Sequence, residues 1–230
     1  MKKLLLFDID GTLITGRGIP KKVALNVIQK HFPNFKNGNE VRFNGMTDPL
    51  IVQQVLASNN HKIELDDPII NIILDDFLCE LKKHVTPQTP PDILPGVENL
   101  LKTCSLDNAI FMGLVTGNMM HGAKIKLNAA GLDSYFSLGA FGSDHWNRNE
   151  LPPIAISRAD KYFGKTFLAE DTWIIGDSPK DVECAKANGL KCLAVLTGKI
   201  DKQVMLKAGA DFVMQDLGNL EEFFSIIKNS

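Results

Sequence analysis

The 230-residue sequence has no long apolar run; its apolar residues come in short stretches instead. No stretch approaches the roughly 18 apolar residues that a membrane-spanning helix needs. Residues 4–7 are apolar and follow Lys2 and Lys3, but Asp8 ends the run before it reaches the length of a signal-peptide core. We therefore expect a protein without a membrane span or a secretion signal.

Cysteine is scarce and unclustered. No two cysteines stand in a Cys-x-x-Cys arrangement or beside a matching histidine pattern, so the spacing gives neither a zinc site nor a disulfide framework. Isolated cysteines of this kind are typically buried free thiols, and they favour a reducing, cytoplasmic location. The four are Cys79, Cys104, Cys184 and Cys192.

Neither sign of charge dominates. Lys and Arg total 25 and Asp and Glu total 27, which gives a formal net charge of −2. No run of five or more basic residues occurs, so the sequence lacks the electrostatic footprint of a nucleic-acid-binding protein. No obligate protein partner is evident either, which directs attention to small-molecule ligands.

The most informative feature of the sequence is its first apolar run, with the two aspartates that follow it. Four apolar residues in a row, 4–7, predict a strand buried on both faces of a parallel sheet. Asp8 and Asp10 follow before Gly11 breaks the pattern, so both carboxylates lie where the strand ends and where open α/β sheets bind ligands. Buried carboxylates need partners, and Mg²⁺ prefers oxygen ligands. A solvated acidic turn is the other reading.

The chain between this strand and residue 84 has a helical pattern. Apolar residues recur at helical spacing over residues 20–31, 49–57 and 68–81, with no convincing strand after Gly16. The proline-rich residues 86–91 then predict a stiff, extended linker. These features indicate a helical insert.

Beyond Pro95 and Gly96, strands alternate with helices, which is the pattern of a parallel sheet. We therefore predict an α/β fold in which a doubly wound, Rossmann-like parallel sheet carries an inserted all-helical cap domain. The predicted sheet domain covers residues 1–15 and 93–230, and the predicted cap covers residues 16–92. The later strands are predicted at 109–115, 135–140, 172–175, 192–196 and 211–213.

Three predicted strands end in small polar residues. The carboxyl ends of parallel strands lie along one edge of a sheet, so these turns can converge although they are far apart in the sequence. Each turn also has a plain structural reading, since Ser178 before Pro179 suits a helix N-cap and Gly117 suits an ordinary loop. Their joint placement at one edge of the sheet favours a ligand-binding site. The turns are Asp8-Ile9-Asp10, Thr116-Gly117-Asn118 and Gly176-Asp177-Ser178.

An apolar strand that ends in Asp8-Ile9-Asp10-Gly11-Thr12 resembles the first motif of the haloacid dehalogenase-like (HAD) hydrolase superfamily. Thr116-Gly117-Asn118 resembles the second motif, and Asp177 with Asp181 resembles the fourth. A HAD core with a helical cap inserted between the first and second motifs has the layout predicted above. The resemblance therefore covers essentially the whole chain, and it is strongest to phosphoglycolate-phosphatase-like members.

The resemblance assigns roles to the two aspartates. Asp8 would be the nucleophile, since a carboxylate is ionised at neutral pH and needs no separate base. Asp10 would protonate the leaving oxygen and later take a proton from water. Attack of Asp8 on phosphorus would give an aspartyl-phosphate. Haloacid dehalogenases and phosphonatases lack an acid at the second position, so Asp10 argues for phosphate esters.

The same resemblance implies a metal and a phosphate site. Asp8, the carbonyl of Asp10 and Asp177 would hold Mg²⁺. Asp181 would orient these groups without binding the metal itself. The hydroxyl of Thr116 and the backbone amides of Gly117 and Asn118 would hold phosphoryl oxygens, because glycine lets the backbone approach closely.

The third motif departs from the common pattern. Many family members carry a lysine in a Lys-Pro-x-Pro arrangement, whereas the matching stretch here begins Arg148-Asn149-Glu150 and ends in two prolines. We take Arg148 as the substitute, a permanent cation able to grip phosphate at two points. A solvated loop arginine is the other reading, and Lys161 and Lys165 are weaker candidates.

In the predicted cap, the stretch from Arg42 to Asp48 resembles the Gly-x-Thr-Asp stretch of phosphoglycolate-phosphatase-like members, where the cap faces the site. Arg42, Asn44 and Thr47 are candidate substrate contacts. The same residues also fit a helix start, with Thr47 or Asp48 as N-cap before Pro49.

We therefore expect a Mg²⁺-dependent phosphatase that hydrolyses a small phosphorylated metabolite through an aspartyl-phosphate. The alternative is a β-phosphoglucomutase-like phosphosugar mutase, which has close to the same four motifs. A non-catalytic binding module is disfavoured, because Asp8, Asp10, Thr116 and Asp177 are all present.

Overall fold

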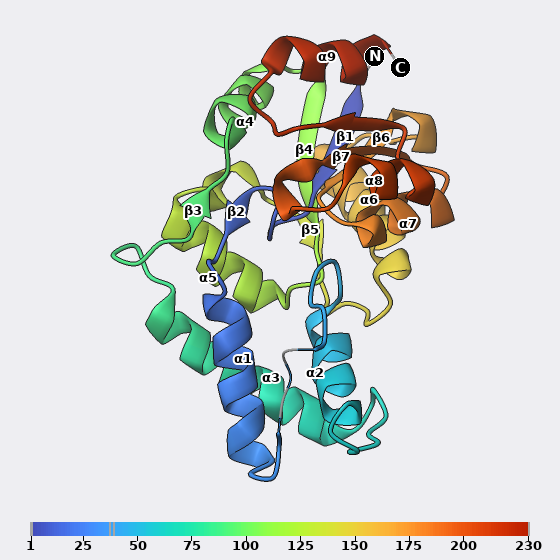
Figure 1. The fold of residues 1–230 in the computed structure, drawn as a ribbon. Coiled ribbons are helices and arrows are strands. Elements are labelled where there is room, and N and C mark those ends of the chain that lie inside the picture. Colours follow the sequence, from blue (N-terminus) through green and yellow to red (C-terminus); the bar gives the residue numbers. More distant parts are fainter. Residues whose placement is uncertain (1, 37, 39, 230) are drawn as a thin grey trace.

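A computed structural model describes residues 2–36, 38 and 40–229 of the chain. Met1, Asn37, Asn39 and Ser230 fall within the predicted domain ranges but lie outside the described residues. A six-stranded sheet forms the centre of the molecule, in the order β5-β4-β1-β6-β7-β8, and every neighbouring pair is parallel (Figure 1). The strands are β1 (Lys3–Phe7), β4 (Ile110–Val115), β5 (Gly139–Ala140), β6 (Thr172–Gly176), β7 (Lys191–Val195) and β8 (Phe212–Met214).

The first strand, β1, is central and buried along its whole length, as its apolar run predicts. Side chains alternate between the two faces of a strand. Leu4 and Leu6 accordingly belong to one apolar cluster, and Leu5 and Phe7 belong to the other. Helices cover both faces, so the predicted doubly wound α/β sheet is confirmed.

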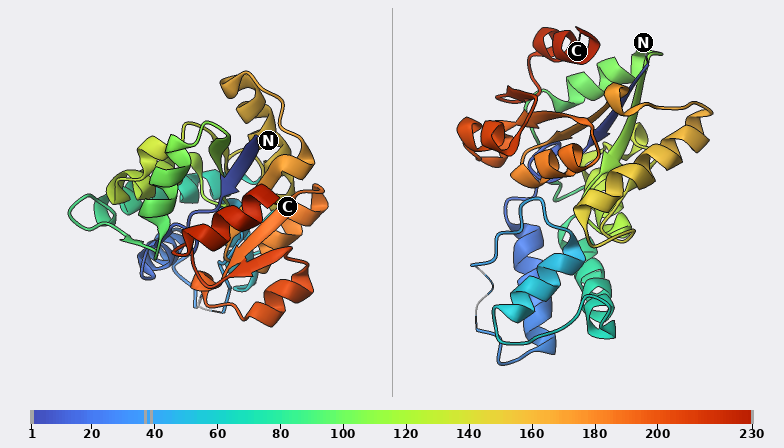
Figure 2. Two further views of the ribbon diagram at one scale, coloured as in Figure 1. Left: turned by 90° about the horizontal axis from the view of Figure 1, so that it is seen from above. Right: turned by 90° about the vertical axis from the view of Figure 1, so that its right-hand side faces the viewer.

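The two clusters draw on different helices. Apolar side chains of α4 (Val97–Leu106), α5 (Met120–Ala130) and α9 (Leu220–Asn229) join the cluster of Leu5 and Phe7. Those of α6 (Leu151–Phe163), α7 (Pro179–Ala187) and α8 (Lys202–Ala208) join the cluster of Leu4 and Leu6. In the view from above, these helices flank the sheet on its two sides (Figure 2, left).

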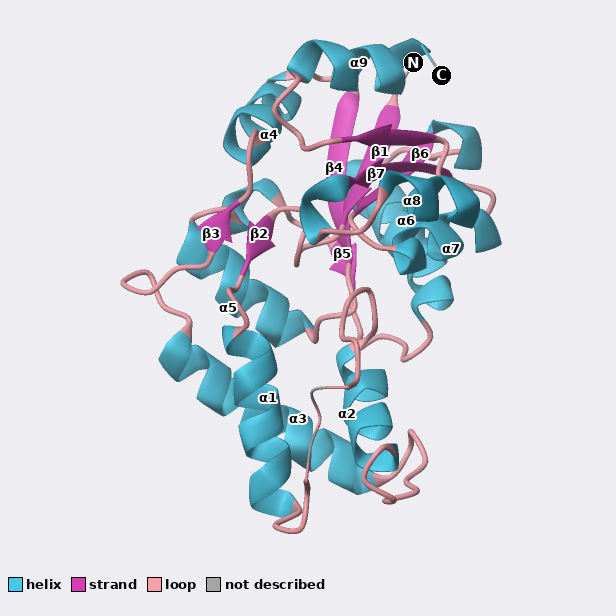
Figure 3. Cartoon of the chain, viewed as in Figure 1, coloured by secondary structure: helices cyan, strands magenta, loops and turns pink. Residues whose placement is uncertain are grey.

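The first three helices of the described chain lie together beyond one edge of the sheet (Figures 1 and 2). They are α1 (Ile19–His31), α2 (Asp48–Ala57) and α3 (Pro68–His84), and they match the predicted helices closely. They share an apolar cluster of their own, with Ile28, Val55, Leu56 and Ile70 among its buried members. Coloured by secondary structure, the described residues of this part form helices and loops (Figure 3).

The chain passes between the sheet and these helices at a small strand pair. Strand β2 (Ile14–Thr15) runs antiparallel to β3 (Asp92–Ile93), and Arg17 forms an ion pair with Asp92 beside it. Two-residue strands leave no periodic pattern, so the sequence predicted only a loop here. The predicted domain boundaries fall at this pair and stay a prediction.

Two local expectations were wrong. The linker 86–91 is not simply extended, because Thr86 and Thr89 close a turn within it. The predicted strand 135–140 shrinks to β5, after a short 3₁₀ turn at Asp133–Tyr135. Phe136, between this turn and β5, packs edge-on against Phe7 at 5.9 Å between ring centroids.

The cysteines are all free thiols, but Cys79 is exposed, contrary to the expectation that all four are buried. Among the described residues, no helix has the length and apolar character needed to cross a membrane.

Candidate active site

The three polar turns meet at one edge of the sheet, at the carboxyl ends of β1, β4 and β6. Phe7 pairs with Leu114 of β4 and with Ile175 of β6, so Asp8 lies between the ends of both neighbouring strands. Its backbone amide donates a hydrogen bond of 2.9 Å to the carbonyl of Ile175. A parallel register of this kind brings together residues that are more than a hundred positions apart.

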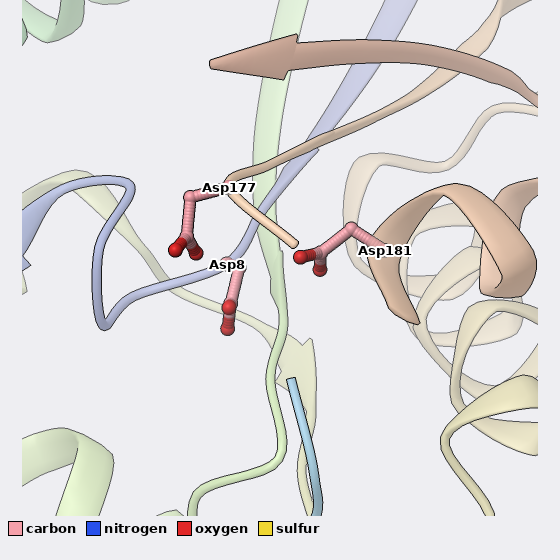
Figure 4. Close-up of side chains that lie close together, drawn as sticks. All are labelled: Asp8, Asp177 and Asp181. Carbon is pink, nitrogen blue, oxygen red and sulfur yellow. The ribbon is translucent and has the colours of Figure 1, made fainter. Parts of the chain in front are cut away.

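Asp8, Asp177 and Asp181 form a buried acidic cluster, with carboxylate oxygens within 4.8 Å of one another (Figure 4). Burial is the main cause that raises the pKa of Asp8 to about 6, and the charges of Asp181 and Asp10 add to it. Burial and the carboxylates of Asp181 and Asp8 raise the pKa of Asp177 to about 8. Negative charge gathered in this way is stabilised by a cation, so the donor set fits the predicted Mg²⁺.

The backbone closes tightly around Asp177. A Cβ atom at Gly11 would lie 2.3 Å from its Oδ2, and one at Gly198 would lie 1.8 Å from the same oxygen. Thr12 donates its hydroxyl to Asp177 at a long 3.4 Å. Glycine is thus required on two sides of this carboxylate, one of them in the loop after β7, which sequence reasoning missed.

Asp181 already has partners for both carboxylate oxygens. Its Oδ2 accepts from the backbone amide of Ser178 at 3.0 Å and from its hydroxyl at 2.6 Å, which caps α7 as the sequence indicated. Its Oδ1 accepts from Arg148. These contacts fit the predicted supporting role better than direct metal ligation.

Arg148 lies inside the site rather than in solvent, at the start of a short 3₁₀ helix (Arg148–Glu150). Its Nη2 is 3.3 Å from Oδ1 of Asp8 and also donates to Asp181 and to the carbonyl of Val115. Despite burial, which opposes its charge, Asp181 and Asp8 hold the pKa of Arg148 above its ordinary range.

This placement changes the expected contact of Arg148. Its Nη1 donates to the carbonyl of Gly45 at 3.1 Å, so both ends of the guanidinium face protein oxygens. The geometry favours charge balance beside Asp8 over the predicted two-point grip on phosphate. Lys161 is exposed, and Lys165 lies over the ring of Phe111 at 5.4 Å, away from the aspartates.

Lys126 is a residue of the site that sequence reasoning missed. It projects from α5, is 5% exposed, and its Nζ lies 2.6 Å from Oδ2 of Asp10 and 2.6 Å from Oδ1 of Asn118. The sequence did contain an indication of this role, because Lys126 lies on the same buried stripe of the helix as Ala123 and Leu127. A lysine on such a stripe needs a buried partner.

Asn118 completes this network. Its Nδ2 donates to Oδ2 of Asp10 at 2.8 Å and to the hydroxyl of Thr116 at 2.8 Å. The sequence offered only the backbone amide of Asn118, whereas its side chain links the first and second motifs. The side chain of Asp10 remains 41% exposed, so these hydrogen bonds fix its position while leaving it accessible to solvent.

The loop before α2 is seated on the sheet edge. Thr47 donates its hydroxyl to the carbonyl of Trp146 at 2.6 Å and caps no helix amide. Asp48 donates its amide to the carbonyl of Gly117 at 2.8 Å, and its Oδ2 accepts from the amide of Met119 at 2.7 Å. Burial raises the pKa of Asp48 to about 6, although Lys126 and the Met119 amide act against the rise.

A cavity of about 340 Å³ lies between this loop, the three helices and the sheet edge. Its lining includes the predicted residues Asp8, Asp10, Thr116, Gly117, Asn118, Arg148 and Asp177, together with Lys126. Asn44 also lines it, whereas Arg42 and Thr47 do not. A larger hollow of about 1260 Å³ lies between α3, α5 and α6, away from the acidic cluster.

Known proteins share this sequence pattern. The family model of the haloacid dehalogenase-like hydrolases matches residues 5–195. The sequence is 29% identical over 94% of the chain to a Dickeya dadantii protein named "Probable phosphatase IndB", 90% of which is covered. It is 27% identical over 96% of the chain to the phosphoglycolate phosphatase of Pseudomonas syringae pv. tomato, of which 79% is covered.

The fold has a match among solved structures. The β-phosphoglucomutase of Clostridium difficile superposes with a TM-score of 0.72 at 18% identity, covering 100% of this chain and 98% of the other. At that identity the likeness concerns the fold. Since the family model spans all four motif regions, the chain belongs to the haloacid dehalogenase-like hydrolase family.

Proposed function

We propose that this protein is a Mg²⁺-dependent phosphatase that hydrolyses a small phosphorylated metabolite through an aspartyl-phosphate on Asp8. The observation that carries the proposal is the contrast between its two leading aspartates. Asp8 is 3% exposed and belongs to the acidic cluster, whereas Asp10 opens to the cavity and is held by Lys126. One carboxylate is therefore suited to the metal and the phosphorus, and the other to proton transfer. Relatives named as phosphatases agree with this choice.

The residues that would hold Mg²⁺ are Asp8, Asp177 and the carbonyl of Asp10. When bound, the ion neutralises charge on the phosphoryl oxygens and fixes their orientation. Arg148 balances the remaining negative charge, since its Nη2 lies 3.3 Å from Asp8. Together these groups allow an anionic nucleophile to approach an anionic ester.

In the first half-reaction, a carboxylate oxygen of Asp8 attacks phosphorus, and the bond from phosphorus to the ester oxygen breaks. Asp10 gives its proton to that leaving oxygen, and the alcohol departs. In the second, Asp10 takes a proton from water as the water oxygen attacks phosphorus. The bond to Asp8 then breaks, which frees inorganic phosphate and restores both carboxyl groups to their starting forms.

Lys126 and Asn118 act on this cycle by positioning Asp10. Both hold its Oδ2, at 2.6 Å and 2.8 Å, which leaves its other oxygen for the proton transfers. Thr116 is anchored by the same Asn118 side chain and lines the cavity beside Asp8. The hydroxyl of Thr116 and the turn at Gly117 are suited to the oxygens of the phosphoryl group.

A phosphosugar mutase is the second candidate, because the β-phosphoglucomutase fold is so similar. The experiment that tests the proposal is phosphate release from a panel of monoesters with Mg²⁺ and without any sugar bisphosphate. A phosphatase releases phosphate steadily, and the Asp8→Asn protein releases none. A mutase would instead need the bisphosphate and release little phosphate. Cytoplasmic location and independence from protein partners stay predictions.

A further inference from the structure

The cavity has two chemically different sides. The sheet edge contributes carboxylates, Arg148 and Lys126, whereas the helical insert contributes mainly hydrocarbon. Apolar side chains of α1, α2, α3 and the loop before α2 line it. Among them are Phe43, Met46, Ile51, Val52, Leu74 and Phe77.

The polar groups on the insert side are already engaged or lie at the edge. Lys21 donates to the carbonyl of Val41 at 3.0 Å and lies over the ring of Phe43 at 4.7 Å. Asp48 is bonded to the amide of Met119. Asn44 is exposed. Two of these three polar side chains are thus held by protein groups, and the third is exposed.

The one further lysine of the lining stands on the opposite side. Lys199 follows Gly198, whose Cα packs against the carboxylate of Asp177. It therefore extends the sheet edge, and the cation on the hydrocarbon side is Lys21, which is held by the carbonyl of Val41 and the ring of Phe43.

We propose that the phosphate ester hydrolysed here has a compact, mainly apolar leaving group, such as a branched alkyl or an aryl alcohol. This inference rests on the proposed phosphatase activity. With the phosphorus at Asp8, the leaving group points away from the sheet edge and into the lining from α2 and α3. Each hydroxyl of a sugar placed there would lose its bonds to water and meet hydrocarbon instead.

The size of the cavity points the same way. A volume of about 340 Å³ is near the lower end of the usual range for small-molecule sites. A two-carbon acid placed there leaves most of the apolar lining in contact with water. A leaving group of about five to eight carbon atoms buries that lining, and burying one methylene changes kcat/KM by roughly tenfold or more.

The test uses the full-length protein with Mg²⁺ and measures kcat/KM by phosphate release. The substrates are methyl phosphate, 3-methylbutyl phosphate, phenyl phosphate, 2-phosphoglycolate and glucose 6-phosphate. We expect the 3-methylbutyl and phenyl esters to exceed the other three by at least about tenfold. If 2-phosphoglycolate or glucose 6-phosphate is the better substrate, the assignment of the leaving group is wrong.

A matched pair of variants separates contact with the leaving group from general effects on the insert. Val52 and Val55 are both buried in α2, at 3% and 0% exposure, but only Val52 lines the cavity. Val52→Thr should lower kcat/KM for 3-methylbutyl phosphate relative to methyl phosphate by roughly three- to tenfold. Val55→Thr should leave that ratio unchanged, whatever it does to the melting temperature.

The outcomes are distinct. Equal ratios in Val52→Thr and Val55→Thr would show that the lining does not contact the leaving group. Absence of hydrolysis for every ester, methyl phosphate included, would overturn the phosphatase itself and the leaving-group class with it. Activity on all esters with no preference would overturn the leaving-group class alone.

Discussion

At the scale of single residues, the two aspartates of the first motif differ in their surroundings far more than in their sequence. Asp8 is enclosed with Asp177 and Arg148, while Asp10 turns to Lys126 and Asn118. The motif alone predicted the location of both. It did not predict Lys126, because a contact between residues 116 positions apart leaves no trace in a single sequence beyond a lysine on an apolar stripe.

Replacing Asp8 with Asn should abolish turnover while the fold persists, since the two side chains are nearly isosteric. Loss of a nucleophile typically costs at least about 10³-fold in kcat. Steady-state phosphate release measures this loss, and circular dichroism checks the fold. A variant that retains a tenth of the wild-type rate would show that Asp8 is not the nucleophile.

Lys126→Met should impair Asp10 as an acid without removing it. The deficit should depend on the leaving group, because alkoxides need a proton and p-nitrophenolate does not. We expect about 10²-fold loss in kcat/KM for an alkyl ester and less than about tenfold for p-nitrophenyl phosphate.

The control for this experiment is Lys124→Met, on the exposed side of the same helix, which should match the wild type. Lys126→Arg should recover part of the loss, because it restores the charge beside Asp10. An equal deficit on both esters would mean that Lys126 serves the fold rather than the proton transfer.

Arg148→Ala should be severe, because it leaves Asp8 and Asp181 with no cation between them. A cation that stabilises charge in phosphoryl transfer can be worth about 10³-fold or more. Arg148→Lys should restore part of kcat/KM, while Lys161→Ala and Lys165→Ala should be mild. If Arg148→Ala keeps nearly the wild-type kcat/KM while one of the two lysine variants loses most of it, the third motif lies at that lysine.

At the scale of elements, the sequence predicted the long helices well because they have many periodic positions, and most sheet strands because they are unbroken apolar runs. It failed where an element is decided by tertiary contacts. Strand β5 is short, and the residue predicted to begin it, Tyr135, ends a 3₁₀ turn instead. The pair β2–β3 forms because the two crossings of the chain meet there.

The seating of the loop before α2 leads to a prediction at this scale. A Cβ atom at Gly117 would lie 2.0 Å from the carbonyl oxygen of Met46, which is backbone and cannot yield easily. Gly117→Ala should therefore push this loop off the sheet edge and raise KM at least about tenfold. Gly122→Ala, within α5, is the control and should leave KM unchanged.

The melting temperature of Gly117→Ala should fall little, because the apolar clusters of the insert and the sheet stay intact. Unchanged kinetics in this variant would mean that the seated loop is not the conformation that binds substrate.

At the scale of the whole molecule, the proposed metal site should couple metal binding to stability through the acidic cluster. Without metal, the pKa of Asp177 is about 8 and that of Asp8 about 6, against an ordinary value of 3.8. Between about pH 4 and pH 8 the folded protein thus holds protons that the unfolded chain has released. The free energy of unfolding should fall as the pH rises through this window.

The proposed Mg²⁺ would bind the ionised cluster and stabilise the folded state by mass action. The rise in melting temperature on adding Mg²⁺ should therefore be larger at pH 8 than at pH 5, and Asp177→Asn should abolish it. A larger rise at pH 5 would contradict a metal site formed by these carboxylates. Chelation should also stop turnover, and Ca²⁺ should restore it poorly because its coordination is looser.

The central claim is that the phosphoryl group passes through Asp8, and trapping it there is the most direct test. The Asp10→Asn variant should load with phosphate from p-nitrophenyl phosphate, whose leaving group needs no acid, and should hydrolyse the intermediate slowly because the base is gone. After an acid quench, peptide mass spectrometry should find one phosphoryl group on the peptide that contains Asp8. The label should be absent without Mg²⁺ and in the variant that also carries Asp8→Asn. A phosphoryl group on another residue, or steady hydrolysis with no labelled peptide, would contradict the account.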